Sequence, residues 1–329
     1  PDIGSANASS ATKQHLAFLD ALRALASVAI VLHHFALYAP LRDIAAPLIG
    51  PLLDWLMHNA RATQVFFVVG GYVMARSMAG KRWDLKRLRL FLLQRYCRLG
   101  LPYIATMAFI LIAYVFARGW LPEEVTGEDV TMRQLLAHLV FLQGLLGEEN
   151  LSAGFWFICI NFQLGLLYAV LLCLRDTAIY RNGDISKIVG WGLAAFSLLH
   201  LNLDVSFDNW ALYFFPYFYM GIILNRAVQN KGIAKEFWLY QALLAFALHQ
   251  DWRWRLAMAA LVAVTIYVVE KTGWRPRWIK SETTRSVCSA EGTTKKCSAA
   301  RGSADPERAL PKASMSWRVL PQPAGPINN

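Results

Sequence analysis

Apolar stretches, most of them near the length of a membrane-spanning helix, recur along the chain between short polar connections. A helix needs about 20 mostly apolar residues to cross the hydrocarbon core of a bilayer. The shorter apolar stretch at 135–146 is followed by Gly-Glu-Glu, which favours a re-entrant or interfacial segment. The pattern predicts an all-α fold, a polytopic transmembrane helical bundle of about eight to nine spans. The predicted spans are residues 18–38, 63–79, 100–117, 154–174, 188–203, 210–225, 237–249 and 256–270.

The two ends of the chain differ from this apolar middle. The first 15 residues are polar and contain no apolar core of a cleavable signal. From residue 279 onward the chain is rich in Ser, Thr, Ala, Gly, Pro, Arg and Lys, a composition that predicts disorder. The sequence therefore predicts a polar N-terminal segment at 1–15, a transmembrane domain at 16–278 and a polar tail at 279–329.

The distribution of charge predicts how the spans are oriented. Charged residues make up 17% of the chain, below the roughly one quarter of a soluble domain. The net charge is +11, but the basic residues stand in short blocks between apolar runs, which is typical of cytoplasmic loops rather than a nucleic-acid-binding face. The connection at 80–99 is strongly basic, whereas the one at 118–131 is acidic. We expect a multi-pass membrane protein with a cytoplasmic N-terminus and no nucleic-acid partner.

Ionisable residues within the first predicted span are the strongest candidates for chemistry, because such side chains are costly in a bilayer. Asp20 and Arg23 are three residues apart and can pair on one helix face. Arg23 and His34 are eleven apart, so they share a face about 16 Å apart along the helix axis. His33 points about 100° away from that face. A structural role is equally open: Arg23 reaching the interface beside Asp20, and a histidine bonded to a neighbouring helix.

Two further segments carry polar or small residues in suggestive positions. Gly70 and Gly71 permit close approach of another helix, which ordinary packing would also explain. Arg95 and Arg98 lie on one face at the entrance to the third span, where two guanidinium groups could clamp a phosphate. Topology and lipid-headgroup contact explain the same two arginines.

The fourth predicted span and the cysteines provide the remaining candidate residues. Trp156 is either an interfacial anchor or a substrate contact, and Asn161 either bonds a neighbouring helix or contacts substrate. Cys97, Cys159 and Cys173 lie in or beside apolar runs without a Cys-x-x-Cys pair, which favours buried thiols over a metal site.

Together these segments resemble the bacterial membrane acyltransferases of acyltransferase family three, over about residues 16–270. Each element alone is unspecific, and their order and spacing make the match. The elements are Leu19-Asp-Ala-Leu-Arg-Ala-Leu-Ala26 followed by His34, Phe66-Phe-Val-Val-Gly-Gly-Tyr72, Arg95-x-x-Arg98 with Pro102-Tyr103, and Trp156 in an apolar run.

The resemblance implies a helical enzyme of the bacterial inner membrane that transfers an acyl group from cytoplasmic acyl-coenzyme A (acyl-CoA). Acetyl-CoA is the expected co-substrate, and no permanently bound cofactor is implied. The acceptor would be a hydroxyl of an exported or envelope polysaccharide or of a lipid-linked sugar. By resemblance, His34 is the catalytic histidine and Asp20 its supporting acid, and Arg23, Arg95 and Arg98 bind the phosphate-bearing donor.

Three departures from the family pattern leave alternatives open. The usual Ser-Gly of the second span is Gly70-Gly71, and Asn161 stands where the family often has a glutamate. The polar tail from about Lys280 replaces a final span that carries a Tyr and a His, as a truncation or frame change would. An inactive remnant of an acyltransferase is therefore one alternative. A transporter or flippase whose Asp20, Arg23 and His34 line a substrate path is another.

Overall fold

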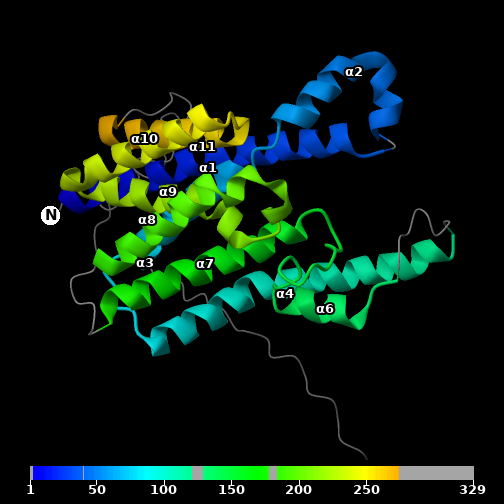
Figure 1. Cartoon of the computed structure of the whole chain (residues 1–329), viewed down its shortest axis with the longest axis horizontal. Helices are drawn as coiled ribbons and strands as arrows, with labels where there is room; N and C mark the ends of the chain where they lie inside the picture. Colours follow the sequence, from blue (N-terminus) through cyan, green and yellow to red (C-terminus); the bar gives the residue numbers. More distant parts are fainter. Residues whose placement is uncertain (1–2, 40, 121–128, 178–183, 274–329) are drawn as a thin grey trace, which may run out of the picture. The chain divides into compact units, whose positions relative to one another are not determined.

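The computed structural model describes residues 3–39, 41–120, 129–177 and 184–273, and the predicted tail lies outside them. Each of the eight predicted spans coincides with a helix in Figure 1, which confirms the all-α fold. Among the described residues, three helices are long and apolar enough to cross a membrane: Phe18–Leu37 of α1, Leu85–Arg118 and Phe155–Asp176. The helices that match predicted spans are α1 (Ile3–Leu37), α3 (Thr63–Met78), α4 (Leu85–Arg118), α7 (Phe155–Asp176), α8 (Asp184–Leu199), α9 (Ala211–Gln229), α10 (Ala234–Gln250) and α11 (Trp254–Thr272).

Three helical regions extend beyond the prediction, and the first is the polar N-terminal segment, where α1 already begins at Ile3. The connection after the first span contains a helix, α2 (Leu41–Asn59), which turns back on α1 to form a hairpin (Figure 1). Its Pro47 and Pro51 flank a kink at Ile49, which the steric effect of proline within a helix explains. α4 begins at Leu85, fifteen residues before its predicted span. Asp84 caps it, because its carboxylate accepts from the Arg87 backbone N–H at 2.7 Å.

The segment predicted as re-entrant or interfacial contains only a short helix, α6 (Met132–Leu139), followed by turns. Thr131 caps the helix by accepting from the Gln134 backbone N–H at 3.1 Å. Phe141 then adopts φ 57°, a left-handed conformation that ends the helical path. The turns lead directly to the start of α7.

The core of the bundle is α9, against which several other helices pack. Of its 19 residues 15 are buried, as expected for a helix that is apolar all round. α3, α8, α10, α11 and α7 all pack against it. Two short 3-10 turns, η2 (Leu201–Leu203) and η3 (Val205–Phe207), connect α8 to α9.

The closest helix contact joins α3 to α9. A Cβ on Gly71 would overlap the backbone carbonyl of Phe218, and one on Gly221 would overlap the carbonyl oxygen of Val68. Both positions therefore require glycine for the two backbones to touch, as small residues allow in membrane helices. The close approach predicted for the Gly70-Gly71 pair is confirmed at Gly71, whereas Gly70 has only a distant ring atom of Phe218 at 4.0 Å.

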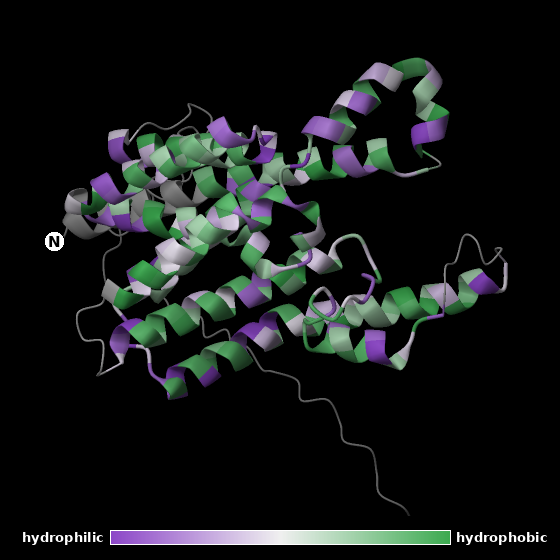
Figure 2. Cartoon of the chain, in the orientation of Figure 1, coloured by the Kyte–Doolittle hydropathy of each residue, from purple (hydrophilic) through white to green (hydrophobic). Residues whose placement is uncertain are grey.

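Large apolar side chains are exposed over much of the outer surface. Figure 2 shows hydrophobic residues along much of α4. Of the 18 consecutive residues that form the apolar stretch of α4, only 17% are buried, whereas the corresponding share for α7 is 44%. A soluble protein rarely exposes so much contiguous apolar surface, and a bilayer accounts for it. Exposed apolar residues of α4 include Leu93, Leu101, Phe109, Ile112, Val115 and Phe116.

Candidate functional site

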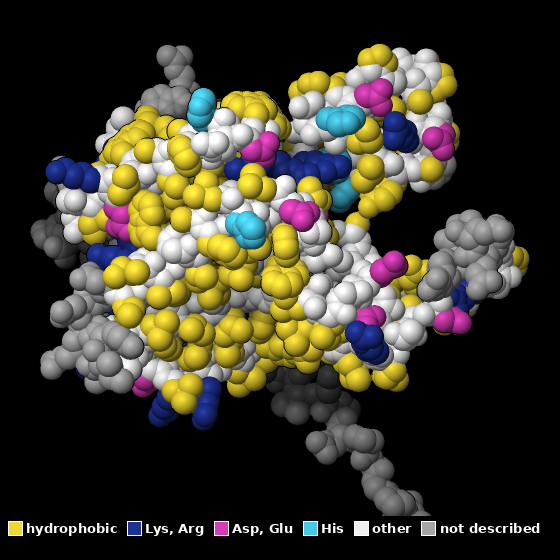
Figure 3. Space-filling view, in the orientation of Figure 1, with side chains coloured by type: hydrophobic (Ala, Val, Ile, Leu, Met, Phe, Trp, Pro, Cys, Tyr) yellow, Lys and Arg dark blue, Asp and Glu magenta, His cyan; other side chains and the backbone are white. Residues whose placement is uncertain are grey.

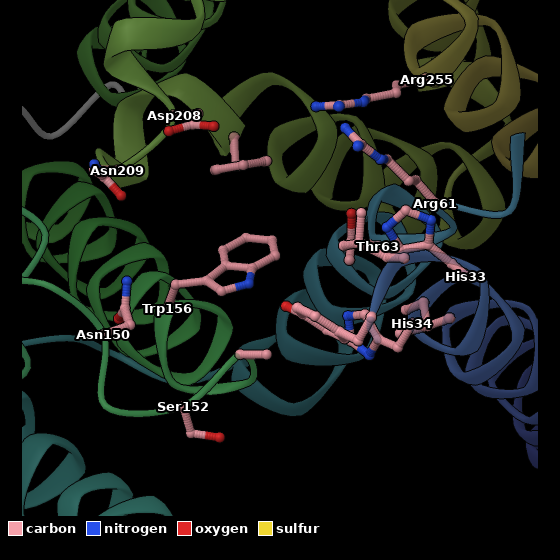
Figure 4. Close-up of a pocket in the computed structure, with 15 residues that line it drawn as sticks. His33, His34, Arg61, Thr63, Asn150, Ser152, Trp156, Asp208, Asn209 and Arg255 are labelled. Atoms are coloured by element: carbon pink, nitrogen blue, oxygen red, sulfur yellow. The ribbon is translucent and has the colours of Figure 1, made fainter. Parts of the chain in front are cut away.

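His34 faces an open cavity of about 480 Å³ at the end of α1 (Figure 4). His33 lines the same cavity, with its ring centroid 5.5 Å from that of His34. His33 therefore borders the site together with His34. The cavity is wide enough to be bordered by neighbouring residues of one helix, although they are about 100° apart around its axis.

Trp156 forms the opposite wall of this cavity from the first turn of α7 (Figure 4). Its ring packs against Phe214 of α9 with centroids 5.5 Å apart. Asn150 and Ser152, from the turns before α7, add polar side chains to the same wall. The cavity thus combines an aromatic surface, hydrogen-bonding groups and two imidazoles.

His138 positions the turns that carry Asn150 and Ser152. Its ring is fully buried, and its Nε2 accepts from the Leu151 backbone N–H at 3.3 Å. Nδ1 therefore carries the proton and donates to the Gln134 carbonyl at 2.8 Å. This histidine ties the wall of the cavity to α6.

Charged residues from three connections complete the cavity. Arg61 precedes α3, Asp208 follows η3 and Arg255 lies in the first turn of α11. Burial lowers the pKa of Arg61, and the nearby charge of Arg255 lowers it further. Burial also raises the pKa of Asp208, an effect that Arg255 opposes.

A second cavity, of about 420 Å³, contains the three arginines that the sequence singles out: Arg23, Arg95 and Arg98. Arg95 is held against α7, because its Nη2 donates to the carbonyl oxygen of Asn161 at 2.7 Å and to the Asn161 Oδ1 at 2.9 Å. Gly165 leaves room for this guanidinium, since a Cβ there would lie 2.5 Å from the Arg95 Nε. Arg98 is exposed and projects from the next turn of α4.

An apolar pocket of about 300 Å³ lies between α1, α3 and α7 and adjoins the histidine cavity. Both contain Ile30, His34 and Trp156. On α1, Arg23, Ser27, Ile30 and His34 follow one another at steps of four, three and four residues, so they share one helix face. That face runs from the arginine cavity past the apolar pocket to the histidine cavity.

A family model described as an acyltransferase domain, of acyltransferase family three, matches residues 16–280. The chain belongs to acyltransferase family three. No curated protein and no solved structure matches it significantly. The acyltransferase is thus a multi-pass membrane enzyme that transfers acyl groups, and family membership favours the enzyme over the transporter alternative.

The predicted site residues of the acyltransferase fall into two groups. His34 and Trp156 meet at one cavity, and the three arginines meet Asn161 at the other. Asp20 does not reach His34: it lies 14 residues earlier on the helix, about 21 Å along the axis, and accepts from the Arg23 Nη1 at 3.2 Å. The structure thus pairs Asp20 with Arg23. The catalytic and binding roles of all seven residues stay predictions.

The sequence alone did not indicate the ionisable residues that accompany His34 in the cavity: His33, Arg61, Asp208 and Arg255. One signal could have found the arginines. Both lie in connections predicted to face away from the cytoplasm, where the positive-inside rule makes basic residues uncommon. Their presence there calls for a specific partner rather than a role in topology.

Proposed function

We propose that this acyltransferase moves an acyl group, most simply acetyl, from acyl-CoA to a hydroxyl of a carbohydrate. The membrane would be the bacterial inner membrane, and the acceptor an exported or envelope polysaccharide or a lipid-linked sugar. The observation that carries the proposal is the single face of α1 that leads from an arginine cavity to a histidine cavity. The donor would enter from the cytoplasm and the acceptor from the opposite side.

The arginine cavity suits the phosphates of acyl-CoA. Guanidinium groups bind phosphate oxygens through paired, charge-assisted hydrogen bonds. Arg98 is exposed at the mouth, whereas the Arg95 Nε is buried without a protein partner among the described residues. Asp20 would hold Arg23 in place, since the two already form an ion pair. The long pantetheine arm of acyl-CoA would then extend past Ser27 and Ile30 towards His34.

The proposed chemistry at His34 uses its imidazole as a general base. Its free nitrogen would take the proton of the acceptor hydroxyl as the oxygen attacks the thioester carbonyl. The resulting tetrahedral intermediate would collapse with cleavage of the carbon–sulfur bond. The imidazolium would return its proton to the departing coenzyme A thiolate. The products are then the ester and free coenzyme A, and no further reactant is needed.

The direct test uses the purified chain in lipid nanodiscs with acetyl-CoA and a set of neutral and acidic oligosaccharides. Mass spectrometry would measure free coenzyme A and the acetylated sugar. We expect acceptor-dependent release of coenzyme A, matched by ester formation, above the level of empty nanodiscs. Release equal to that of empty nanodiscs with every acceptor would argue for an inactive chain.

Replacement of Arg98 by glutamine is expected to raise the KM for acetyl-CoA roughly 10- to 100-fold. A hydrogen bond to a charged group contributes about 1.5–3 kcal/mol, and each 1.4 kcal/mol changes affinity about tenfold. Initial rates at varied acetyl-CoA would measure it. Arg89→Gln is the matched control, because Arg89 is an exposed arginine of α4 that does not line the cavity. Equal KM values for the two variants would exclude Arg98 from donor binding.

A bulky residue at Ser27 is expected to block the acyl path. Ser27→Phe would fill the apolar pocket and lower kcat about 10- to 100-fold by displacing the thioester, without weakening the binding of acetyl-CoA. Val28→Phe is the control, because Val28 is 57% exposed and lies outside the pocket. Turnover and donor binding would be measured separately. Similar turnover in both variants would place the acyl path elsewhere.

A further inference from the structure

Arg61 and Arg255 face the histidine cavity without a carboxylate partner within ion-pair distance among the described residues (Figure 4). Arg253, two residues before Arg255, is by contrast paired with Asp251 at 3.3 Å. Figure 3 shows basic side chains gathered beside histidine in the hollow between the α1–α2 hairpin and the rest of the bundle.

The charges of the cavity do not balance. Two guanidinium groups face a single carboxylate, Asp208, among the lining residues that the structure describes. The Arg61 Nε is buried and has no hydrogen-bond partner there. A buried polar donor without a partner is costly, and like charges close together add to the cost. An anion bound between Arg61 and Arg255 would relieve both.

We propose that Arg61 and Arg255 form a subsite for an acidic group on the sugar acceptor, either a carboxylate or a phosphate. Planar guanidinium groups bind both anions bidentately. The inference rests on the proposed function, because it concerns the cavity in which His34 would activate the acceptor hydroxyl. Asn150 and Ser152 lie across the cavity, where they would contact the uncharged hydroxyls of the sugar.

Binding measured without any acyl donor separates this inference from the proposed function. The protein in zwitterionic nanodiscs would be titrated with D-glucuronate, glucose 6-phosphate and D-glucose, and saturation-transfer NMR would give the Kd values. We expect glucuronate or glucose 6-phosphate to bind at least about tenfold more tightly than glucose, because a hydrogen bond between charged groups is worth at least one factor of ten. The carboxylate and phosphate arms identify which anion the subsite prefers. Equal Kd values for all three sugars would overturn the proposal.

Substitutions locate the anion on the two arginines. Arg61→Gln and Arg255→Gln should each abolish the preference for the acidic sugar, while glucose binding stays unchanged and shows that the cavity is intact. Arg42→Gln is the matched control, because Arg42 belongs to the exposed pair with Asp54 on α2 and does not line the cavity. A preference that survives both cavity substitutions would overturn the assignment.

A lipid phosphate is the other source of an anion near a membrane surface. Nanodiscs that contain phosphatidylglycerol should leave the Kd of glucuronate unchanged. Competition by this lipid would overturn the acceptor subsite and assign the arginines to headgroup binding. If the acidic sugars bind through the arginines but no ester forms with acetyl-CoA, the subsite stands and the proposed acyl transfer fails. If neutral sugars are acetylated but acidic sugars do not bind more tightly than glucose, the proposed acyl transfer stands and the acidic subsite fails.

Discussion

Replacement of His34 by glutamine is expected to lower kcat for acetyl transfer by about 10²- to 10⁴-fold, the range that a positioned general base contributes. Glutamine keeps a similar volume and hydrogen-bonding ability but cannot take the hydroxyl proton at neutral pH. The KM for acetyl-CoA should change little, because Arg23, which lines the arginine cavity, lies about 16 Å away along α1. Steady-state kinetics in nanodiscs with a fixed acceptor would measure both constants.

His33→Gln is the matched control for this variant. His33 borders the same cavity but is nearly buried, with 7% of its surface exposed, whereas His34 also borders the apolar pocket through which the thioester would arrive. We expect His33→Gln to retain most of the activity. The opposite result, loss of turnover in His33→Gln and retention in His34→Gln, would assign the base to His33. Thermal unfolding of both variants would show whether either loss reflects misfolding.

The fold was largely predictable from the sequence, because a bilayer imposes a length and an apolar composition on every span. The prediction failed where polar residues interrupt helices. α2 was not predicted, because Pro47 and Pro51 interrupt its sequence. The first half of α4 was not predicted either, because basic residues between 86 and 98 break the apolar pattern, although the helix is continuous. Helical backbone geometry does not depend on hydropathy, so apolar runs underestimate the length of helices that leave the membrane.

The candidate site was predictable only within a helix. The pairing of Asp20 with Arg23 follows from their spacing, and so does the common face of Arg23 and His34. The contact of Arg95 with Asn161 joins two helices, and periodicity does not reveal which helices are neighbours. The supporting role assigned to Asp20 could have been checked by spacing in the same way, because 14 residues of one helix place it about 21 Å from His34. Arg61 and Arg255 belong to different elements, so periodicity could not show that they border one cavity.

Replacement of Gly71 by alanine is expected to destabilise the enzyme by about 3 kcal/mol, the upper end of the usual cost of overpacking a core. The added Cβ would meet the backbone carbonyl of Phe218, and a backbone atom cannot rotate away as a side chain can. α3 and α9 would have to move apart, and the packing between these two helices at the centre of the core would be lost. The loss of stability would be measured by thermal unfolding of the purified protein in detergent and by the fraction of the protein that is monodisperse.

Gly70→Ala is the matched control, because the two glycines are adjacent on α3 and receive the same added methyl group. At Gly70 the new Cβ meets only a ring atom of Phe218 at 4.0 Å, an ordinary contact, and alanine is favoured over glycine within a helix by about 1 kcal/mol. We therefore expect the Tm to rise slightly in Gly70→Ala and to fall sharply in Gly71→Ala. Gly221→Ala should behave like Gly71→Ala, since its Cβ would overlap the Val68 carbonyl from the other side of the same contact. Equal Tm values for Gly70→Ala and Gly71→Ala would contradict the close contact of α3 with α9.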